Sequence, residues 1–466
     1  IYNPKHIFKP YSTKMITVVA SYNVTPNKPT PKNPLWLSVS DQIMFLGHVS
    51  TIYIYKTKPN NTHIEELRNS LSKILVYYYP VAGRLSLTKS GRMEMDCNAK
   101  GVTLLEAETT NTFGDYGDFS PSESTEELIP KVDYTQPIEE LPQLVVQLTK
   151  FHGGEGLAIG VSMSHVFFDG ISGAQFIYAW AKMARGETLE PNEIPFLDRT
   201  ILKFPHQPSA PCADLPESKL PVQVLNNFDS DFDSHVAIAS LKLTSSQVEK
   251  LKKKANDEPL KEGMIPYSRF EAIGAHIWKC ASKARECGEN QPTVARFVVD
   301  IRGRLNPPLS RNYVGNALVK TVSPECYVGD IISKPLSYVA QKIRHAIDVV
   351  TDEYIRSQLN VTLAQEQLDS IRAFFSGKGI RMNSPDPGNC NIVIAGWLNM
   401  PVYEADFGWG KPVHFGLGSD FREERAVIMP SSDGNGVLVT TNLQTIDMQL
   451  FKKFFYNDIY EIYSAM

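Results

Sequence analysis

The segment His165-Val166-Phe167-Phe168-Asp169-Gly170 places an imidazole and a carboxylate four residues apart, a pairing suited to proton transfer. A neutral histidine with a pKa near ~6.5 can take a proton from an attacking hydroxyl or amine at cellular pH. The apolar run Leu157–Ser162 predicts a buried strand before it, and the periodic apolar residues of Ile171–Arg185 predict a helix after it. His165 is therefore expected where a strand leaves a sheet, a common place for chemistry in layered α/β proteins.

Other familiar chemical sites are missing from the sequence. It contains no GxxxxGK[ST] phosphate loop, no GxGxxG after a strand, no HExxH zinc motif and no GxSxG nucleophile elbow. No zinc spacing and no activating motif partner accompanies any of the six cysteines, which are Cys97, Cys212, Cys280, Cys287, Cys326 and Cys390. We therefore predict no metal, no permanently bound cofactor and no covalent acyl-enzyme.

The elements that must position His165 alternate irregularly along the chain. Strand-like runs occur at Val49–Tyr55, Leu144–Phe151, Leu157–Ser162, Val236–Leu243, Val294–Ile301, Asn391–Leu398 and Gly436–Thr441. Two capping boxes, from Thr62 to Glu65 and from Ser268 to Glu271, each followed by an apolar stripe, predict amphipathic helices. We infer an α/β fold built of α+β layers.

The domain organisation follows from length and from breaks in composition. The 466 residues suffice for two large domains. The stretch 186–235 is rich in proline and is interpreted as a crossover linker. The predicted domains are then residues 15–185, which carry His165, and residues 236–466. Met15 is the expected native start, so residues 1–14 are left out of the fold, and 376–389 is predicted to be a surface loop.

Charge and hydropathy exclude several classes of partner. Lys and Arg number 47 against 51 Asp and Glu, a formal net charge of −4, and no basic cluster is interleaved with aromatic residues, so no nucleic-acid partner is expected. No apolar run approaches the ~18 residues of a membrane-spanning helix, and the N-terminal sequence lacks an apolar signal core. We expect no membrane partner and a cytoplasmic location, where the cysteines would be free thiols.

A second motif, Asp406-Phe407-Gly408-Trp409-Gly410, lies far along the chain. Together with HxxxDG it resembles the signature of the plant BAHD acyltransferases, which use coenzyme A thioesters. Three further segments match in order and spacing, namely Tyr79–Leu85, Asp300–Arg304 and Tyr313–Asn316. The resemblance implies a two-domain fold of the chloramphenicol-acetyltransferase-like type, with a channel between the domains and His165 at its middle.

The resemblance also implies roles for single residues. His165 would act as general base and return the proton to the thiolate leaving group. Asp169 would point away from the channel and pair with an arginine, for which Arg302 is the candidate in this sequence. Asp406 and Gly408 would lie away from the reaction centre and maintain the shape of the channel.

Contacts to the substrates are expected at four further positions. The helix start at Ser268 and Arg269 offers N–H groups and a positive charge to the phosphates of coenzyme A, although an ordinary capped helix has the same sequence. His48 matches a histidine that faces the acceptor pocket in relatives, with a buried core histidine as the alternative. Trp409 is either an indole donor to the oxyanion or a packing residue.

The acceptor is predicted from local similarity. The segments Ser21–Pro26, Pro29–Pro31 and Leu35–Ser38 are most similar to spermidine hydroxycinnamoyltransferases, which acylate amines. Shikimate-type relatives carry an arginine seven residues before the aspartate of the second motif, and Asn399 stands there in this chain. Because asparagine supplies no charge for a carboxylate, we predict that a monomeric enzyme transfers a hydroxycinnamoyl group from coenzyme A to a polyamine of the spermidine type.

Two alternatives stay open at this stage. An enzyme of the same family would instead form esters with shikimate, quinate or another specialised alcohol. An inactive binding protein of the same fold is the more distant alternative, and the intact His165 and Asp169 count against it.

Overall fold

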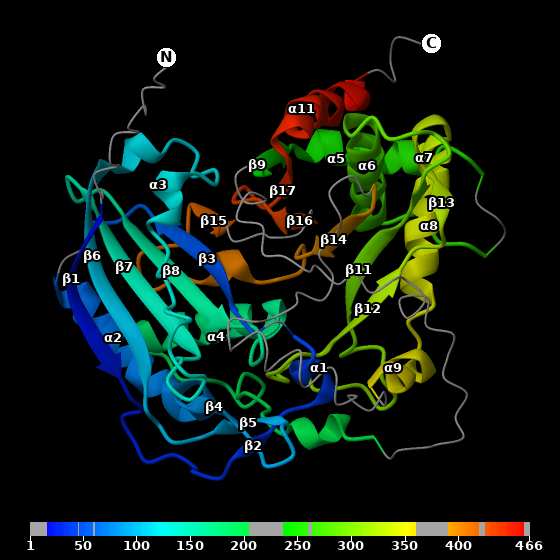
Figure 1. Cartoon of the computed structure of the whole chain (residues 1–466). Helices are drawn as coiled ribbons and strands as arrows, with labels where there is room; N and C mark the ends of the chain where they lie inside the picture. Colours follow the sequence, from blue (N-terminus) through cyan, green and yellow to red (C-terminus); the bar gives the residue numbers. More distant parts are fainter. Residues whose placement is uncertain are drawn as a thin grey trace, which may run out of the picture.

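Two six-stranded sheets, each covered by helices on one face, organise the chain (Figure 1). The computed structural model describes residues 16–44, 46–58, 61–204, 236–259, 263–359, 390–418 and 425–460. Within these ranges the mixture of helices and strands confirms the predicted α/β class with α+β layers.

The first sheet holds the strand that leads to His165. Its strands, in spatial order, are β1 (Ile16–Val24), β6 (Val102–Thr112), β7 (Leu144–His152), β8 (Leu157–Ser164), β3 (His48–Tyr55) and β15 (His414–Leu417). All neighbours are antiparallel except β6 and β7. Helices α2 (Asn61–Tyr77) and α4 (Gly170–Ala184) pack together, and their apolar residues share one core cluster with residues of β3, β7 and β8.

Smaller elements complete the first domain. A three-stranded sheet consists of β2 (Leu35–Trp36), β5 (Met93–Asp96) and β4 (Arg84–Leu87). The short helices are α1 (Val39–Gln42), η1 (Tyr79–Ala82), η2 (Phe113–Tyr116), α3 (Glu123–Glu126) and η3 (Arg199–Leu202).

The second sheet has parallel strands at its centre. Its order is β12 (Leu318–Val322), β11 (Ala295–Asp300), β14 (Ile392–Gly396), β16 (Arg425–Pro430), β17 (Val437–Gln444) and β9 (Val236–Leu243), with β14 parallel to both neighbours. The helices that share a core cluster with this sheet are α5 (Ser245–Ala255), α6 (Arg269–Ala284), α7 (Val328–Ser333), α8 (Leu336–Asp348) and α11 (Thr445–Tyr460). The remaining elements are β10 (Pro292–Thr293), β13 (Cys326–Tyr327), α9 (Asp352–Leu359) and η6 (Val402–Glu404).

The predicted domain limits need two corrections. The second half of the chain does not stay in the second sheet, because β15 leaves it and pairs antiparallel with β3 of the first sheet. The first part of the stretch predicted as a linker is packed against the rest of the protein. Phe196 forms a β-bridge with Tyr313, and Arg199 of η3 is fully buried. Residues 205–235 of that stretch, the loop predicted at 376–389 and residues 1–14 lie outside the described residues.

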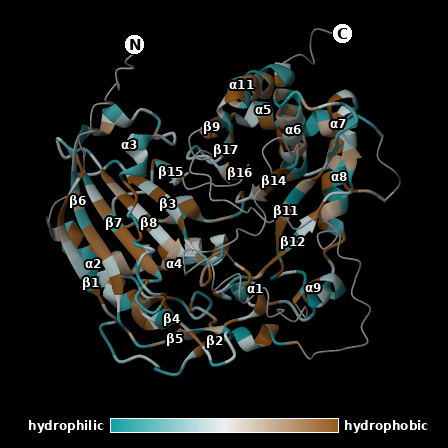
Figure 2. Cartoon of the chain, viewed as in Figure 1, coloured by the Kyte–Doolittle hydropathy of each residue, from teal (hydrophilic) through white to brown (hydrophobic). Residues whose placement is uncertain are grey.

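Local sequence signals agree with most of the elements. The run Val236–Leu243 is a strand with those bounds, and the predicted capping box at the start of α6 forms, with Glu271 N–H donating to Ser268 Oγ. Helix α2 begins at Asn61, before its predicted cap, and its apolar stripe is buried through Ile64, Leu67, Leu71, Ile74, Leu75 and Tyr78. Figure 2 shows hydrophobic residues recurring along the strands of both sheets.

The prediction of free thiols is wrong for two cysteines. Cys287, just after α6, and Cys390, just before β14, form a disulfide. Cys97, Cys280 and Cys326 are free and buried, while Cys212 lies outside the described residues. The disulfide joins the end of a core helix to the central strand of the second sheet.

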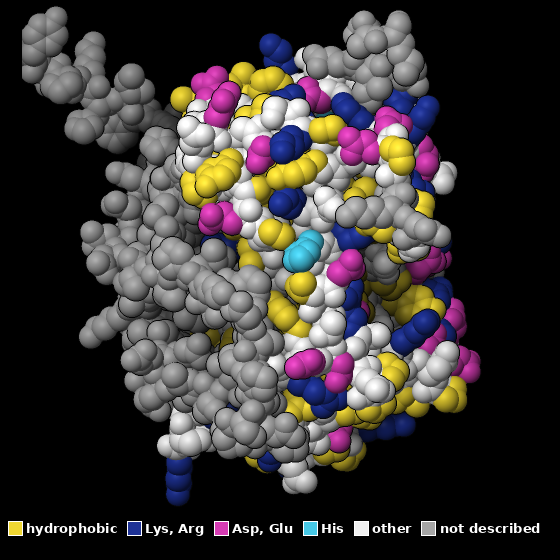
Figure 3. Space-filling view, turned by 90° about the vertical axis from the view of Figure 1, so that its right-hand side faces the viewer, with side chains coloured by type: hydrophobic (Ala, Val, Ile, Leu, Met, Phe, Trp, Pro, Cys, Tyr) yellow, Lys and Arg dark blue, Asp and Glu magenta, His cyan; other side chains and the backbone are white. Residues whose placement is uncertain are grey.

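The part of the chain that the structure describes carries charges of both signs on its surface. Figure 3 shows Lys and Arg side chains interspersed with Asp and Glu on the described part of one face. No described helix is long and apolar enough to cross a bilayer. Within the same residues, no group of three or more His, Cys, Asp or Glu side chains could hold a metal ion.

Candidate active site

His165 lies in the short loop between β8 and α4, as the sequence predicts. Its backbone N–H donates to the carbonyl of Gly47 (2.9 Å), just before β3. Asp169 caps α4 and forms a capping box with Ser172, accepting from its N–H at 2.8 Å. Because the loop is closed by a strand at one end and a capped helix at the other, the position of His165 is set by regular structure on both sides.

The predicted pairing of Asp169 with Arg302 is confirmed. Arg302 Nη2 lies 2.8 Å from Asp169 Oδ2, and both side chains are almost fully buried. The N–H of Ala317 donates to the same oxygen (3.1 Å). Arg302 and Ala317 follow β11 and precede β12, so the carboxylate ties the His165 loop of the first domain to the second. With these partners Asp169 acts as a fixed anchor for the loop.

Burial is the main influence on the imidazole. It lowers the pKa of His165 below the ordinary 6.5, and the positive charge of Arg425 lowers it further. A hydrogen bond to its own backbone, the charge of Asp169 and a side-chain hydrogen bond with Asn316 oppose this by raising the pKa. The net lowering leaves the ring neutral at pH 7, the form that can accept a proton.

Activity is therefore expected to persist into mild acid. If His165 must be neutral, kcat/KM should stay constant from about pH 8 downward and fall only when the pH drops below the lowered pKa. The midpoint of this acid limb should lie below 6.5, the ordinary histidine value. Rates of thioester loss between pH 5 and 8, at subsaturating substrate, measure it, and a midpoint above the ordinary value would contradict the assignment.

Arg425, at the start of β16, was not anticipated from the sequence. Ala426 and Ile428 pack in the core of the second domain, whereas Val427 and Met429 pack in that of the first. Because side chains alternate along a strand, Arg425 lies on the face of β16 that is turned toward the first domain. Only the sheet topology brings this residue close to His165, so no local pattern could have revealed it.

Asn316 is a second residue of the site whose role the sequence did not disclose. It belongs to the Tyr313–Asn316 segment that matched the family. Its Nδ2 donates to the carbonyl of His165 (2.8 Å) and to that of Val166 (3.2 Å). The residue type gave one signal of these contacts, because a buried asparagine needs hydrogen-bond partners for both the oxygen and the nitrogen of its amide.

His48 is held by the protein on both ring nitrogens. Its Nδ1 lies 2.9 Å from the hydroxyl of Tyr134, and its Nε2 lies 2.8 Å from the carbonyl of Pro142. Burial lowers the pKa of His48 to about 4, so the ring is neutral. In this arrangement His48 has the contacts of a structural core histidine, which was the alternative interpretation of this residue.

Trp409 does not lie near His165, which removes the hypothesis of an oxyanion donor. Its indole packs 5.7 Å from the ring of Tyr55 and 5.2 Å from that of His63. Tyr55 is at the end of β3 opposite to His48, and His48 is the residue that pairs with Ser164 beside His165. Seven residue steps at about 3.3 Å each separate these ends by roughly 23 Å. Packing is therefore the function of Trp409 that the structure supports.

Asp406 shapes the turn that carries the chain between the domains. Its Oδ1 accepts from the N–H groups of Gly408 (2.7 Å) and Gly410 (2.9 Å). Gly408 has φ of +105°, which a side chain would strain. The carbonyl of Ala405 accepts from the buried hydroxyl of Tyr55 (2.6 Å). The motif thus anchors the segment between β14 and β15 to the first domain, in line with its predicted structural role.

Three predicted substrate contacts occupy exposed positions. Ser268 and Arg269 are exposed at the start of α6, where the Ser268 N–H already donates to Glu271 (2.6 Å). Asn399 is exposed in the turn after β14, between Trp397 and Met400. That turn approaches Gly170, next to Asp169. Contacts of these residues with coenzyme A or acceptor stay predictions.

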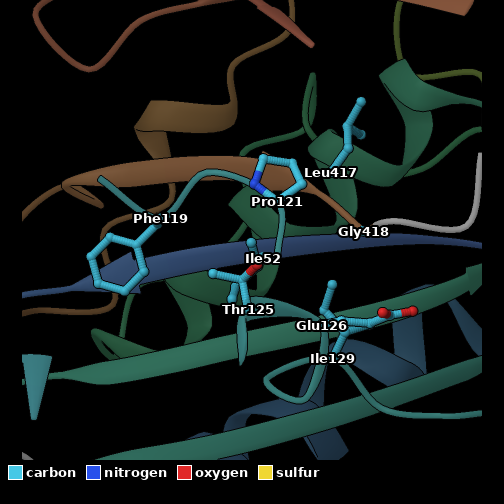
Figure 4. Close-up of a pocket in the computed structure, with 8 residues that line it drawn as sticks. All are labelled: Ile52, Phe119, Pro121, Thr125, Glu126, Ile129, Leu417 and Gly418. Atoms are coloured by element: carbon cyan, nitrogen blue, oxygen red, sulfur yellow. The ribbon is translucent and has the colours of Figure 1, made fainter. Parts of the chain in front are cut away.

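Two small hollows occur among the described residues. One lies over β3, lined by Phe119, Pro121, Thr125 and Leu417 among others (Figure 4), and the other lies beside His48, Ser164 and Val166. Each has a volume of about 10 Å³, which is room for one water molecule and not for a substrate. The channel expected between the domains stays a prediction.

Comparison with known proteins decides the family. A model of the Transferase family matches residues 14–458. The chain belongs to this family, the BAHD acyltransferases. It is 39% identical over 455 residues to a hydroxycinnamoyl-CoA:piscidic acid hydroxycinnamoyltransferase of Actaea racemosa, covering 96% of this chain and 100% of the relative. A shikimate O-hydroxycinnamoyltransferase of Nicotiana tabacum is 36% identical, with 95% and 99% covered.

Solved structures confirm the fold of this BAHD acyltransferase. Vinorine synthase superposes with a TM-score of 0.70 at 22% identity, over 93% of this chain and 96% of its own. TRI101 of F. sporotrichioides, solved with coenzyme A and T-2, gives 0.73 at 18% identity, over 90% and 97%. The enzyme is thus a coenzyme A-dependent acyltransferase. The spermidine-type acceptor finds no support in these two relatives, whose names favour the alternative of an ester-forming enzyme.

Proposed function

We propose that this acyltransferase moves a hydroxycinnamoyl group from coenzyme A to a hydroxyl group of an acceptor that carries a carboxylate. The observation that carries the proposal is the neutral, half-buried imidazole of His165, set between the two sheets in a chain related to hydroxycinnamoyltransferases. Both relatives are named for acceptors that are carboxylic acids with hydroxyl groups, piscidic acid and shikimate.

The reaction needs one base and no acyl-enzyme. An imidazole nitrogen of His165 takes the proton of the acceptor hydroxyl while its oxygen attacks the thioester carbon. The carbon–sulfur bond of the resulting tetrahedral intermediate then breaks, and the imidazolium returns the proton to the departing thiolate. The ester and free coenzyme A are the products, and His165 is neutral again.

Arg425 supports an acidic acceptor over a polyamine. Its positive charge acts on the His165 ring, so it also acts on any molecule bound at the ring. A carboxylate there would be attracted, whereas the cationic spermidine would be repelled. Arg425 on β16 would supply the positive charge that Asn399 does not. The uncharged residue at position 399 is then no longer a reason to expect an amine acceptor.

An acceptor panel tests the proposal. With p-coumaroyl-CoA as donor, shikimate, quinate and piscidic acid should give esters, identified by product mass, with higher kcat/KM than spermidine. The methyl ester of shikimate is the matched neutral substrate. A charge-assisted contact is typically worth about 1.5–3 kcal/mol, so the acid should exceed its methyl ester by about 10- to 100-fold in kcat/KM.

The variant Arg425→Gln separates acceptor binding from catalysis. It should remove the preference for shikimate over the methyl ester, mainly through KM, and shift the acid limb of the pH profile upward because a positive charge near His165 is lost. Higher kcat/KM of the wild-type enzyme with spermidine than with every acid would overturn the acceptor class.

A further inference from the structure

A second buried polar cluster contacts the His165 loop, and its centre is Asp41 at the start of the first domain. Asp41 in α1 is fully buried. Its Oδ1 accepts from the N–H of Asn316 (2.9 Å) and from Asn316 Nδ2 (3.0 Å). Its Oδ2 accepts from the N–H and hydroxyl of Ser38 and forms an ion pair with Arg199 Nε at 3.2 Å. Three distant segments thus meet at one carboxylate.

The partners of Asp41 hold the carbonyl groups of the loop. Asn316 Nδ2 donates to the carbonyls of His165 and Val166, as described above. Arg199 Nη2 donates to the carbonyl of Phe167 (3.2 Å), and the guanidinium carbon lies 4.4 Å from the centre of the Phe167 ring. The carbonyls of the three residues 165–167, which follow β8, therefore accept hydrogen bonds from Asn316 and Arg199. Both of these side chains contact the carboxylate of Asp41.

We propose that Asp41 is a positioning residue for His165: it fixes the amide of Asn316, which holds the carbonyl groups of His165 and Val166 and so sets the position of the imidazole. The carboxylate of Asp41 and the two loop carbonyls can only accept hydrogen bonds. The end of the Asn316 amide that faces them is therefore its donor, Nδ2. The proposal rests on His165 being the general base.

The position of the loop matters because a general base must lie within hydrogen-bond reach of the proton that it takes. Asp41 holds Asn316 through its backbone N–H and its Nδ2, and the same Nδ2 holds the carbonyls of His165 and Val166. Without the charge of Asp41 this hold weakens, and the imidazole of His165 is less precisely placed.

Two variants test this chain of contacts. Asp41→Asn keeps the shape of the side chain and removes its charge, and Asn316→Ala removes the link to His165. Each should lower kcat about 10- to 100-fold, the range expected for a misplaced catalytic group, while KM for the acyl-CoA changes less than about 3-fold. The double variant should be no slower than Asn316→Ala by more than about 3-fold, since Asp41 acts through Asn316.

A matched control is Asp458→Asn, which removes another nearly buried carboxylate, paired with Lys283 in the second domain. It should lower the melting temperature and leave kcat and the pH profile of the folded enzyme unchanged. Asp41→Asn with wild-type kcat would overturn the proposal. If that variant does not fold, Asn316→Ala decides, because Ser38 and Arg199 still contact Asp41. Failure of the base assignment would be seen separately, as activity retained in His165→Ala.

Discussion

Replacing His165 with alanine is expected to lower kcat by at least about 100-fold, because a positioned general base commonly contributes between about 10² and 10⁴. The buried histidines His48 and His276 are hydrogen-bonded to backbone carbonyls and cannot substitute for it. The loop itself should keep its shape, since its hydrogen bonds to Gly47 and Asn316 involve the backbone of His165. Steady-state rates with p-coumaroyl-CoA, together with thermal melting, measure both parts.

The exposed His345, in the last turn of α8, provides the control. His345→Ala should keep wild-type kcat, which shows that the loss in His165→Ala is specific to the loop. A His165→Ala enzyme with normal melting and less than about a 10-fold loss of kcat would exclude His165 as the base.

Asp169→Asn is expected to cost both stability and activity. The change leaves the buried guanidinium of Arg302 without one of its two carboxylate partners, and breaking a buried pair typically costs about 3–5 kcal/mol. Activity should fall with stability because the same carboxylate caps α4 and binds Ala317, on which the loop depends. Denaturant unfolding and kcat of the purified variant are the two measurements.

The more exposed pair of Asp352 with Arg356 is the matched control for this variant. Asp352→Asn should change the free energy of unfolding by about 1 kcal/mol or less, because solvent screens a surface pair. An Asp169→Asn protein as stable as the wild type would show that the pair with Arg302 does not hold the loop.

The sequence alone located the candidate general base, His165, and most of the elements around it. The strand before His165, the helix after it and the capping box at Ser268 depend on periodicity and on hydrogen bonds between residues a few positions apart. Such signals are local, because all the residues that produce them lie within one short stretch of the chain. The pairing of Asp169 with Arg302 also came from the sequence, although only through resemblance to a family.

The tertiary structure decided which distant residues share the site. The sequence left Trp409 open between an oxyanion donor and a packing residue, and the pairing of β3 with β8 puts it at the end of the sheet opposite to His165. It assigned Arg199 to a linker, whereas the fold buries Arg199 against Asp41. It gave no reason to consider Arg425, because the face of β16 on which a side chain lies is set by the packing of both domains. Strand order, the crossing of β15 and the partners of a buried charge arise from contacts between residues hundreds of positions apart, and no local pattern of residues encodes them.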